Sequence, residues 1–250
     1  MDQVYEMHPI TKRFLANLVA VFGEFDISGE LESRRSVTKN VRRVIVHRQY
    51  DAATFANDLA LLELESPVAF DEHIVPICMP KDKEDFTGRM ATVTGWGRLK
   101  YEVQVPVIEN AVCQEMFHTA GHNKVILNSF LCAGYANGQK DSCEGDSGGP
   151  LMLERDDGRW VLVGTVSHGI KCAAPYLPGV YMRTTYYKPW LQAITGGDSG
   201  GPLMLERDDG RWVLVGTVSH GIKCAAPYLP GVYMRTTYYK PWLQAITGVN

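Results

Sequence analysis

A serine flanked by glycines lies in the stretch Gly145-Asp146-Ser147-Gly148-Gly149, where a tight turn could present it as a nucleophile. A serine hydroxyl attacks a carbonyl poorly unless a neighbouring imidazole takes its proton. A carboxylate must in turn orient that imidazole and stabilise its charged form. Glycine permits the backbone angles that such a turn needs. The chemistry open to this loop is acyl transfer through serine, provided that a histidine and a carboxylate reach it.

This loop occurs twice in the chain. Residues 145–196 recur without a change as residues 197–248, so Ser199 duplicates Ser147. The identity includes the Arg-Asp-Asp-Gly stretch at residues 155–158, where many residue types would serve equally well on a surface. Because structural need does not explain identity at such positions, we interpret the repeat as a recent duplication or as an error in assembling the gene model.

The elements that would position these residues are mostly strands. Runs rich in Val, Leu, Ile and Thr alternate with Gly, Pro, Asn and Asp at short intervals, which is typical of a barrel or sandwich. The expected strands are Val41–Val46, Leu59–Leu64, Met90–Thr94 and Trp160–Val166. Apolar residues at helical spacing predict helices over Tyr186–Ile194 and its copy Tyr238–Ile246, with a further short helix over Glu115–His122.

Composition and charge exclude several classes of function. The chain has 250 residues, of which 45% are hydrophobic, and a net charge of -3, so it can bury a core and offers no basic surface for nucleic acid. No apolar run reaches the roughly 18 residues that a membrane-spanning helix needs. Residues 1–12 lack the apolar core of a secretory signal peptide. No cluster of His, Cys and Asp has metal-ligand spacing, so we expect no metal and no cofactor.

Four separated motifs resemble those of the chymotrypsin- and trypsin-like serine proteases, in the order that this family has them. They are Asn57–Leu62, Thr94–Gly97, Asp141–Pro150, and the combination of Ser167–Gly169 with Pro178–Tyr181. A lone Gly-Asp-Ser-Gly would be a weak sign, whereas four motifs in order are a strong one. The resemblance runs from about Phe14 to Gly196 and then restarts in the second copy.

The resemblance implies an all-β fold with two antiparallel β-barrels, the first incomplete, a C-terminal helix and a duplicated C-terminal segment. It divides the chain into an unmatched segment at residues 1–13, a partial trypsin-like protease domain at residues 14–196, and the repeat at residues 197–248. The first copy is expected to complete the second barrel. The strand Trp212–Val218 of the second copy would then be an exposed apolar edge, which is an aggregation hazard.

The resemblance also assigns catalytic roles. Ser147 would be the nucleophile and Asp58 the orienting carboxylate. The backbone amides of Gly145 and Ser147 would form the oxyanion hole, which stabilises the charge that develops during acyl transfer. In active family members the residue at Asp146 pairs with the N-terminal ammonium that zymogen cleavage releases.

A specificity pocket follows from the same comparison. Asp141 would form its floor, and Ser167, Gly169 and Gly179 would form its walls. A buried carboxylate selects a cationic side chain, because burying an unpaired charge is costly. The implied reaction is hydrolysis of polypeptides after Arg or Lys.

The catalytic histidine is missing from this pattern. The family motif Thr-Ala-Ala-His-Cys should end just before Phe14, and residues 1–12 bear no likeness to it. His8 falls near the expected position but lies between Met7 and Pro9 in a terminal segment, so it is a weak candidate. The remaining histidines are worse candidates: His47 and His73 are expected at the surface, His118 and His122 in a loop, and His168 with its copy His220 beside the substrate groove.

We therefore expect a serine endopeptidase by descent whose present chain has negligible activity. The alternatives are a pseudoprotease that binds partners without cleaving them and an unstable product of a misassembled gene model. Fluorophosphonate labelling, solubility and binding of Arg-bearing ligands would discriminate among the three.

The six cysteines point to an oxidising compartment. The resemblance implies disulfides Cys113–Cys132 and Cys143–Cys172, and assigns Cys78 to a tether with an upstream pro-segment. Cys224 duplicates Cys172 and has no partner of its own in this scheme. The expected location is extracellular.

Overall fold

The computed structural model describes residues 12–29, 34–98, 102–195, 202–206, 212–220, 232–235, 237 and 239–241. The chain divides into two compact units, residues 1–186 and residues 187–250. His8 and Cys224, which the sequence singled out, lie outside the described residues.

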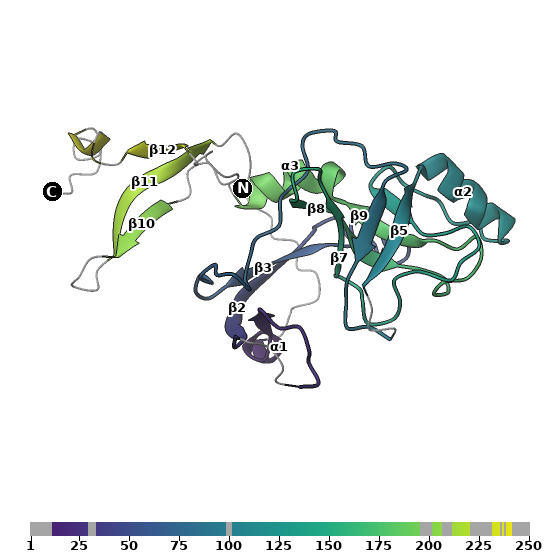
Figure 1. Ribbon diagram of the computed structural model, residues 1–250, viewed down its shortest axis with the longest axis horizontal. Coiled ribbons are helices and arrows are strands. Elements are labelled where there is room, and N and C mark those ends of the chain that lie inside the picture. Colours follow the sequence, from purple (N-terminus) through teal and green to yellow (C-terminus); the bar gives the residue numbers. More distant parts are fainter. Residues whose placement is uncertain are drawn as a thin grey trace. The chain divides into compact units, whose positions relative to one another are not determined.

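Six strands of the first unit close into an antiparallel barrel (Figure 1). They are β4 (Met90–Val93), β5 (Val103–Ile108), β6 (Phe130–Ala133), β7 (Pro150–Glu154), β8 (Trp160–His168) and β9 (Gly179–Arg183). Their order around the barrel is β4-β5-β6-β9-β8-β7. The barrel therefore consists of two three-stranded meanders, joined where β4 pairs with β7 and where β6 pairs with β9.

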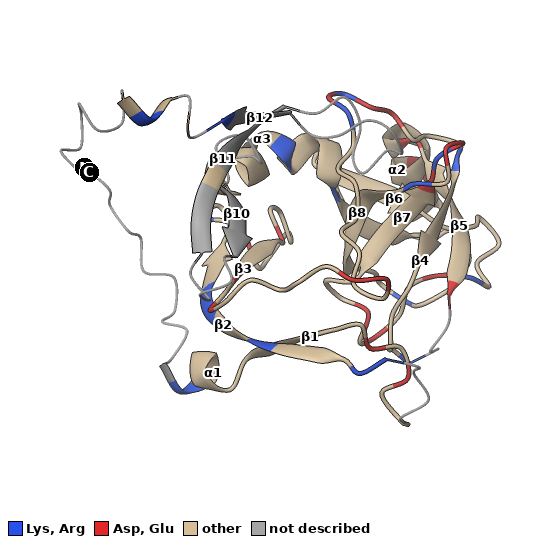
Figure 2. Ribbon diagram, turned by 60° about the vertical axis from the view of Figure 1, so that its left-hand side comes forward, with Lys and Arg blue, Asp and Glu red and all other residues tan. Residues whose placement is uncertain are grey.

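Alternation along these strands fills the barrel interior with apolar side chains. Those with no exposed surface include Val105, Leu131, Leu151, Val161 and Tyr181. Within the six strands Glu154 and Arg183 are the only Asp, Glu, Lys or Arg residues, and Figure 2 shows the other such residues of this barrel region in the connecting loops and helices. This burial is the main source of the barrel's stability, at about 25 cal/mol for each Å² of apolar surface removed from water.

A second sheet of this unit remains open. It comprises β1 (Val19–Phe22), β2 (Val37–Val46) and β3 (Ala60–Leu64) in the order β1-β2-β3. A short helix, α1 (Lys12–Ala16), precedes β1. Val19, Val21 and Leu62 are each about half exposed, because no further described strand covers them. The structure thus confirms a mostly β fold with one closed barrel and a first barrel that is incomplete among the described residues.

Helix positions differ from the sequence-based predictions at their ends. Helix α2 spans Asn110–Thr119 and not Glu115–His122. It begins earlier because Cys113, Met116 and Phe117 have helical spacing and are all buried. Helix α3 spans Thr184–Thr195, starting two residues before the predicted Tyr186, since it follows β9 without an intervening loop.

The repeat forms a sheet of its own. Strands β10 (Pro202–Glu206), β11 (Trp212–His220) and β12 (Val232–Arg235) make an antiparallel meander in the order β10-β11-β12. The prediction that Trp212–Val218 forms an exposed edge is wrong, because β11 pairs with a strand on each side. Of the helix predicted at Tyr238–Ile246, the structure describes residues 239–241 as helical, and the remainder lies outside the described residues.

Both predicted disulfides are present. Cys113–Cys132 ties α2 to β6, and Cys143–Cys172 joins two loops of the barrel. Cys78 is buried, and its backbone bonds with Trp160 and Leu162 of β8. None of the described helices is long and apolar enough to cross a membrane.

Candidate active site

Asp58 lies at the start of the turn into β3, where the first sheet meets the barrel. The turn is set by Asn57, whose φ is 58° and whose side-chain amide donates to the Gln49 carbonyl at 2.8 Å. The Ser167 hydroxyl, at the end of β8, donates to Asp58 Oδ2 at 2.6 Å. Asp58 and Ser167 are far apart in sequence, so this bond is a tertiary contact between the two sheets. The pocket-wall role of Ser167 stays a prediction, and its neighbours Val166 and His168 line the smaller cavity described below.

His168 continues this chain of polar groups. Its Nδ1 lies 2.8 Å from the Ser167 hydroxyl oxygen, and its ring stacks on Phe55 with centroids 4.6 Å apart. Its Nε2 is buried without a hydrogen-bond partner. Burial, together with the nearby Lys124 cation, lowers the pKa of His168 to about 4. The imidazole is thus neutral near pH 7 and packs between the rings of Phe55 and Phe130.

The other described histidines do not complete a triad. His47 is 7% exposed, and burial, followed by the charge of Arg48, lowers its pKa. The prediction of a surface position for His47 is therefore wrong, because the residue directly follows β2 and its amide bonds to Leu59 beside β3. His73 is half-buried, with Nε2 3.1 Å from the Arg35 carbonyl. No described histidine forms a hydrogen bond with Asp58 or Ser147.

The nucleophile loop turns at two glycines, Gly145 and Gly148, whereas Gly149 does not have a left-handed φ. Gly145 and Gly148 have φ values of 92° and 82°, in the region that favours glycine. The Gly148 amide donates to the Val166 carbonyl at 2.8 Å, which anchors the loop to β8. Ser147 is exposed at the tip. The amides of Gly145 and Ser147 donate no hydrogen bond to another described residue.

Asp146 links this loop to the Thr94–Gly97 motif. Its carboxylate accepts hydrogen bonds from the Gly97 and Cys143 amides, each at 2.9 Å. A Cβ on Gly97 would lie 2.6 Å from the Asp146 carboxyl carbon and 2.7 Å from the Glu144 carbonyl oxygen, and one on Gly95 would overlap the same carboxylate. Sequence reasoning treated this motif as a marker of the family and missed that its glycines make room for Asp146.

Asp141 lies in the cavity that Ser147 also lines. This cavity has a volume of about 220 Å³ and is also bounded by His168, Gly169 and the disulfide. Asp141 is only 7% exposed, and burial raises its pKa to about 6, against the opposing effect of a 3.2 Å bond from the Ala173 amide. The carboxylate thus has few partners and is costly to ionise while the cavity is empty.

The two glycines predicted in the pocket wall have different surroundings. A Cβ on Gly179 would lie 2.6 Å from Asp141 Oδ1, so glycine is required for the carboxylate to fit. Gly169 lines the cavity, and a Cβ there would meet no atom within 4 Å. Gly179 therefore provides room for Asp141, and Gly169 leaves the cavity open.

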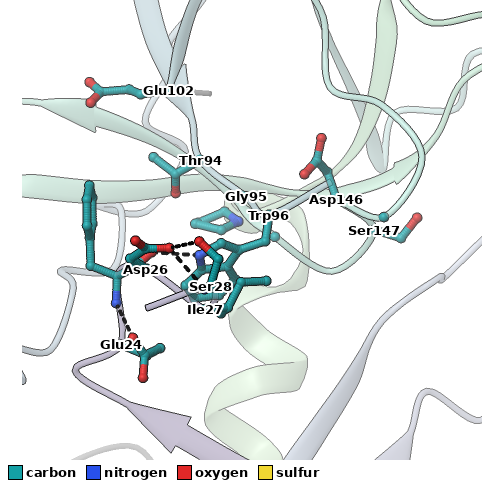
Figure 3. A pocket seen from close by; sticks show the side chains of 14 residues that line it. Glu24, Asp26, Ile27, Ser28, Thr94, Gly95, Trp96, Glu102, Asp146 and Ser147 are labelled. Atoms are coloured by element: carbon teal, nitrogen blue, oxygen red, sulfur yellow. Dashed lines mark hydrogen bonds between the residues drawn. The ribbon is translucent and has the colours of Figure 1, made fainter. Parts of the chain in front are cut away.

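A larger cavity of about 1030 Å³ is also lined by Ser147 (Figure 3). Its walls include the loop Glu24–Ser28, the Thr94–Trp96 segment, Glu102, Asp146 and Pro150. The Trp96 indole N–H donates to the Phe25 carbonyl at 2.8 Å, and Asp26 accepts a bond from the Ser28 amide at 2.9 Å. Ser147 therefore borders both cavities.

Sequence comparisons identify the family. The family model described as Trypsin matches residues 16–191 and again residues 192–243. The chain belongs to the trypsin family. It is 82% identical over 192 residues to serine protease filzig of Drosophila melanogaster, covering 73% of this chain and 11% of the relative.

Other trypsin-family relatives are more distant. Serine proteinase stubble of the same fly is 41% identical over 193 residues, covering 74% of this chain and 24% of the relative. The venom protease of Bombus pensylvanicus is 36% identical over 182 residues, covering 68% of this chain and 72% of the relative. The chain thus spans a small part of the two fly proteins. The family makes it a hydrolase by descent, and proteolysis is the activity that its relatives' names give.

Proposed function

We propose that this chain retains the substrate-recognition site of a trypsin-like serine endopeptidase. It binds polypeptides through an Arg or Lys side chain and hydrolyses them negligibly. The observation that carries this proposal is the buried Asp141 carboxylate in the cavity that Ser147 lines. A cationic side chain that enters the cavity would stabilise the ionised carboxylate, whose pKa burial has raised to about 6.

The two cavities together favour a polypeptide ligand over a small cation. An Arg or Lys in the smaller cavity would place the adjoining backbone beside Ser147. The free amides of Gly145 and Ser147 could then bind its carbonyl oxygen. The larger cavity gives room for residues beyond that point. A polypeptide therefore fits the site better than a small isolated cation does.

None of the described histidines is placed to take the proton of Ser147, and this supports negligible cleavage. The Asp58 carboxylate accepts a hydrogen bond from the Ser167 hydroxyl and from no described imidazole. The Nδ1 atom of His168 is within hydrogen-bond distance of that same Ser167 hydroxyl. Without an imidazole, the serine attacks slowly, and only the oxyanion hole and binding remain to accelerate the reaction. In this proposal Ser147 is the former nucleophile. Asp146 would accept a hydrogen bond from an N-terminal ammonium released by cleavage, and Cys78 would be the site of a disulfide to a pro-segment.

The two disulfides support an extracellular location, because such bonds persist in oxidising compartments. The partner class that follows is an extracellular polypeptide with an accessible Arg or Lys.

A pair of peptides tests the proposal. An acetylated peptide with a central arginine should bind at least about tenfold more tightly than the same peptide with citrulline, which has nearly the same shape but no charge. Isothermal titration at pH 8 would measure both dissociation constants, and mass spectrometry of the recovered peptides would show whether either was cut. Equal affinities would contradict the recognition of a cation, and cleavage after arginine would contradict the absence of turnover.

A further inference from the structure

The second unit presents a sheet that is identical in sequence to half of the barrel. Strands β10–β12 repeat the residues of β7–β9. Their registers correspond as well: Pro202 pairs with Thr217 as Pro150 pairs with Thr165, and both sheets shift register at the equivalent positions. The repeat therefore folds into the same meander as the barrel half from which it was copied.

The edges of this meander lack the partners that the first copy has. In the barrel, the outer side of β7 pairs with β4 and the outer side of β9 pairs with β6. In the described part of the second unit, β10 and β12 each pair with β11 alone. Unpaired strand edges with the same residues are templates for pairing with another strand.

The face of the β10–β12 sheet that carries Val215 is also less buried than the matching face of the β7–β9 sheet in the barrel. Val163 in β8 is 1% exposed in the barrel, whereas the identical Val215 in β11 is only partly buried. An isolated three-stranded sheet removes less apolar surface from water than a closed barrel does. Closing this sheet against a complementary meander would therefore stabilise it.

The barrel topology identifies that complement. Its two meanders join first strand to first strand, β4 with β7, and third strand to third strand, β6 with β9, and both junctions are antiparallel. Two identical meanders related by a twofold axis can pair in this same way, because a twofold axis perpendicular to the strands makes like edges antiparallel. The β4–β6 meander of each chain is already occupied by β7–β9.

We propose that the chain forms a homodimer in which the β10–β12 sheets of two copies close into a six-stranded barrel. In this barrel, β10 pairs with β10 of the second copy and β12 pairs with β12 of the second copy. The occupant of the open sheet is thus a second copy of this chain. Because each pair of copies uses all four free edges, the assembly closes at two.

A charge-swap experiment on the full chain tests this dimer. Met204 lies at the centre of β10, and its counterpart Met152 is the residue through which β7 pairs with Thr92 of β4. Met152 is half-buried between the buried Leu151 and Leu153, and we therefore expect a polar residue to be tolerated at the equivalent position 204. In the proposed dimer two copies of residue 204 lie near the twofold axis.

The unmodified chain should sediment as a dimer at micromolar concentration. Met204→Lys alone and Met204→Glu alone should each weaken the dimer at least about tenfold, because like charges face each other across the strands. An equimolar mixture of the two variants should dimerise again, which also shows that both variants are folded. A monomeric unmodified chain, dimers that ignore either charge, a mixture that stays monomeric, or oligomers that grow beyond two would each overturn the proposal.

Discussion

Asp141→Asn should remove the preference for the arginine peptide over the citrulline peptide, weakening arginine binding about 30- to 100-fold. The reason is that Asp141 supplies the buried negative charge of the smaller cavity, where it is 7% exposed. Asparagine keeps the size and the hydrogen-bonding oxygen but not the charge, and hydrogen bonds between charged groups are about twice as strong as neutral ones. Titration calorimetry at pH 8 with both peptides measures this loss.

The same substitution should stabilise the empty protein. The folded-state pKa of Asp141, about 6, lies above its ordinary value of 3.8, so the folded state keeps a proton that the unfolded state releases between these values. Stability therefore falls as pH rises from about 4 to 6 and stays lower above that window. Asp141→Asn should raise the unfolding free energy at pH 8 by on the order of 3 kcal/mol, and by nothing below pH 4.

Asp157→Asn is the matched control, because it removes an exposed carboxylate from the turn between β7 and β8. It should change neither the peptide preference nor the pH dependence of stability. For the unmodified chain, arginine-peptide affinity should fall about tenfold per pH unit once the pH drops well below 6, as protonation neutralises Asp141. Retention of the arginine preference in Asp141→Asn would show that another group recognises the cation.

Gly97→Ala should destabilise the barrel by about 1–3 kcal/mol and disorder the nucleophile loop. The added Cβ would lie 2.7 Å from the Glu144 carbonyl oxygen and would press on the Asp146 carboxylate. Relief of this clash would break the 2.9 Å bonds that hold Asp146 to the Gly97 and Cys143 amides. Thermal unfolding and arginine-peptide binding should both show the loss, because Cys143 and Glu144 also line the smaller cavity.

Gly169→Ala separates this clash from a general effect of replacing glycine. Its Cβ would meet no atom within 4 Å, and its backbone does not have a left-handed φ. Its melting temperature should therefore stay within a few degrees of the unmodified chain. A Gly97→Ala protein that melts like Gly169→Ala would show that the Asp146 anchorage does not hold the loop.

Local pattern was sufficient to predict much of this fold. Runs of β-branched and apolar residues located strands such as Trp160–Val166, which is β8 with its end extended to His168. The family resemblance carried by the motifs implied the closed barrel and both disulfides, and both are present. Helix starts were less accurate, because the start of α2 depends on burial of Cys113 and Phe117, which composition alone does not reveal.

Contacts between distant segments were beyond sequence reasoning. The bond from Ser167 to Asp58 and the bonds from Gly97 and Cys143 to Asp146 each join motifs that had been recognised separately. The burial of His47 likewise depends on β3 lying alongside the end of β2. The central position of β11 was missed because an apolar strand does not indicate how many neighbours it has.

The most direct test of the central claim is the reactivity of Ser147 toward a fluorophosphonate probe. The probe should be applied to folded full-length chain, with Ser147→Ala and Ser199→Ala as controls, and the labelled peptide should be identified by mass spectrometry. The structure predicts no labelling of Ser147 above the Ser147→Ala background, because no described imidazole bonds to Ser147 or Asp58. Rapid labelling that Ser147→Ala abolishes and Ser199→Ala preserves would contradict this account and would show that a base reaches the serine.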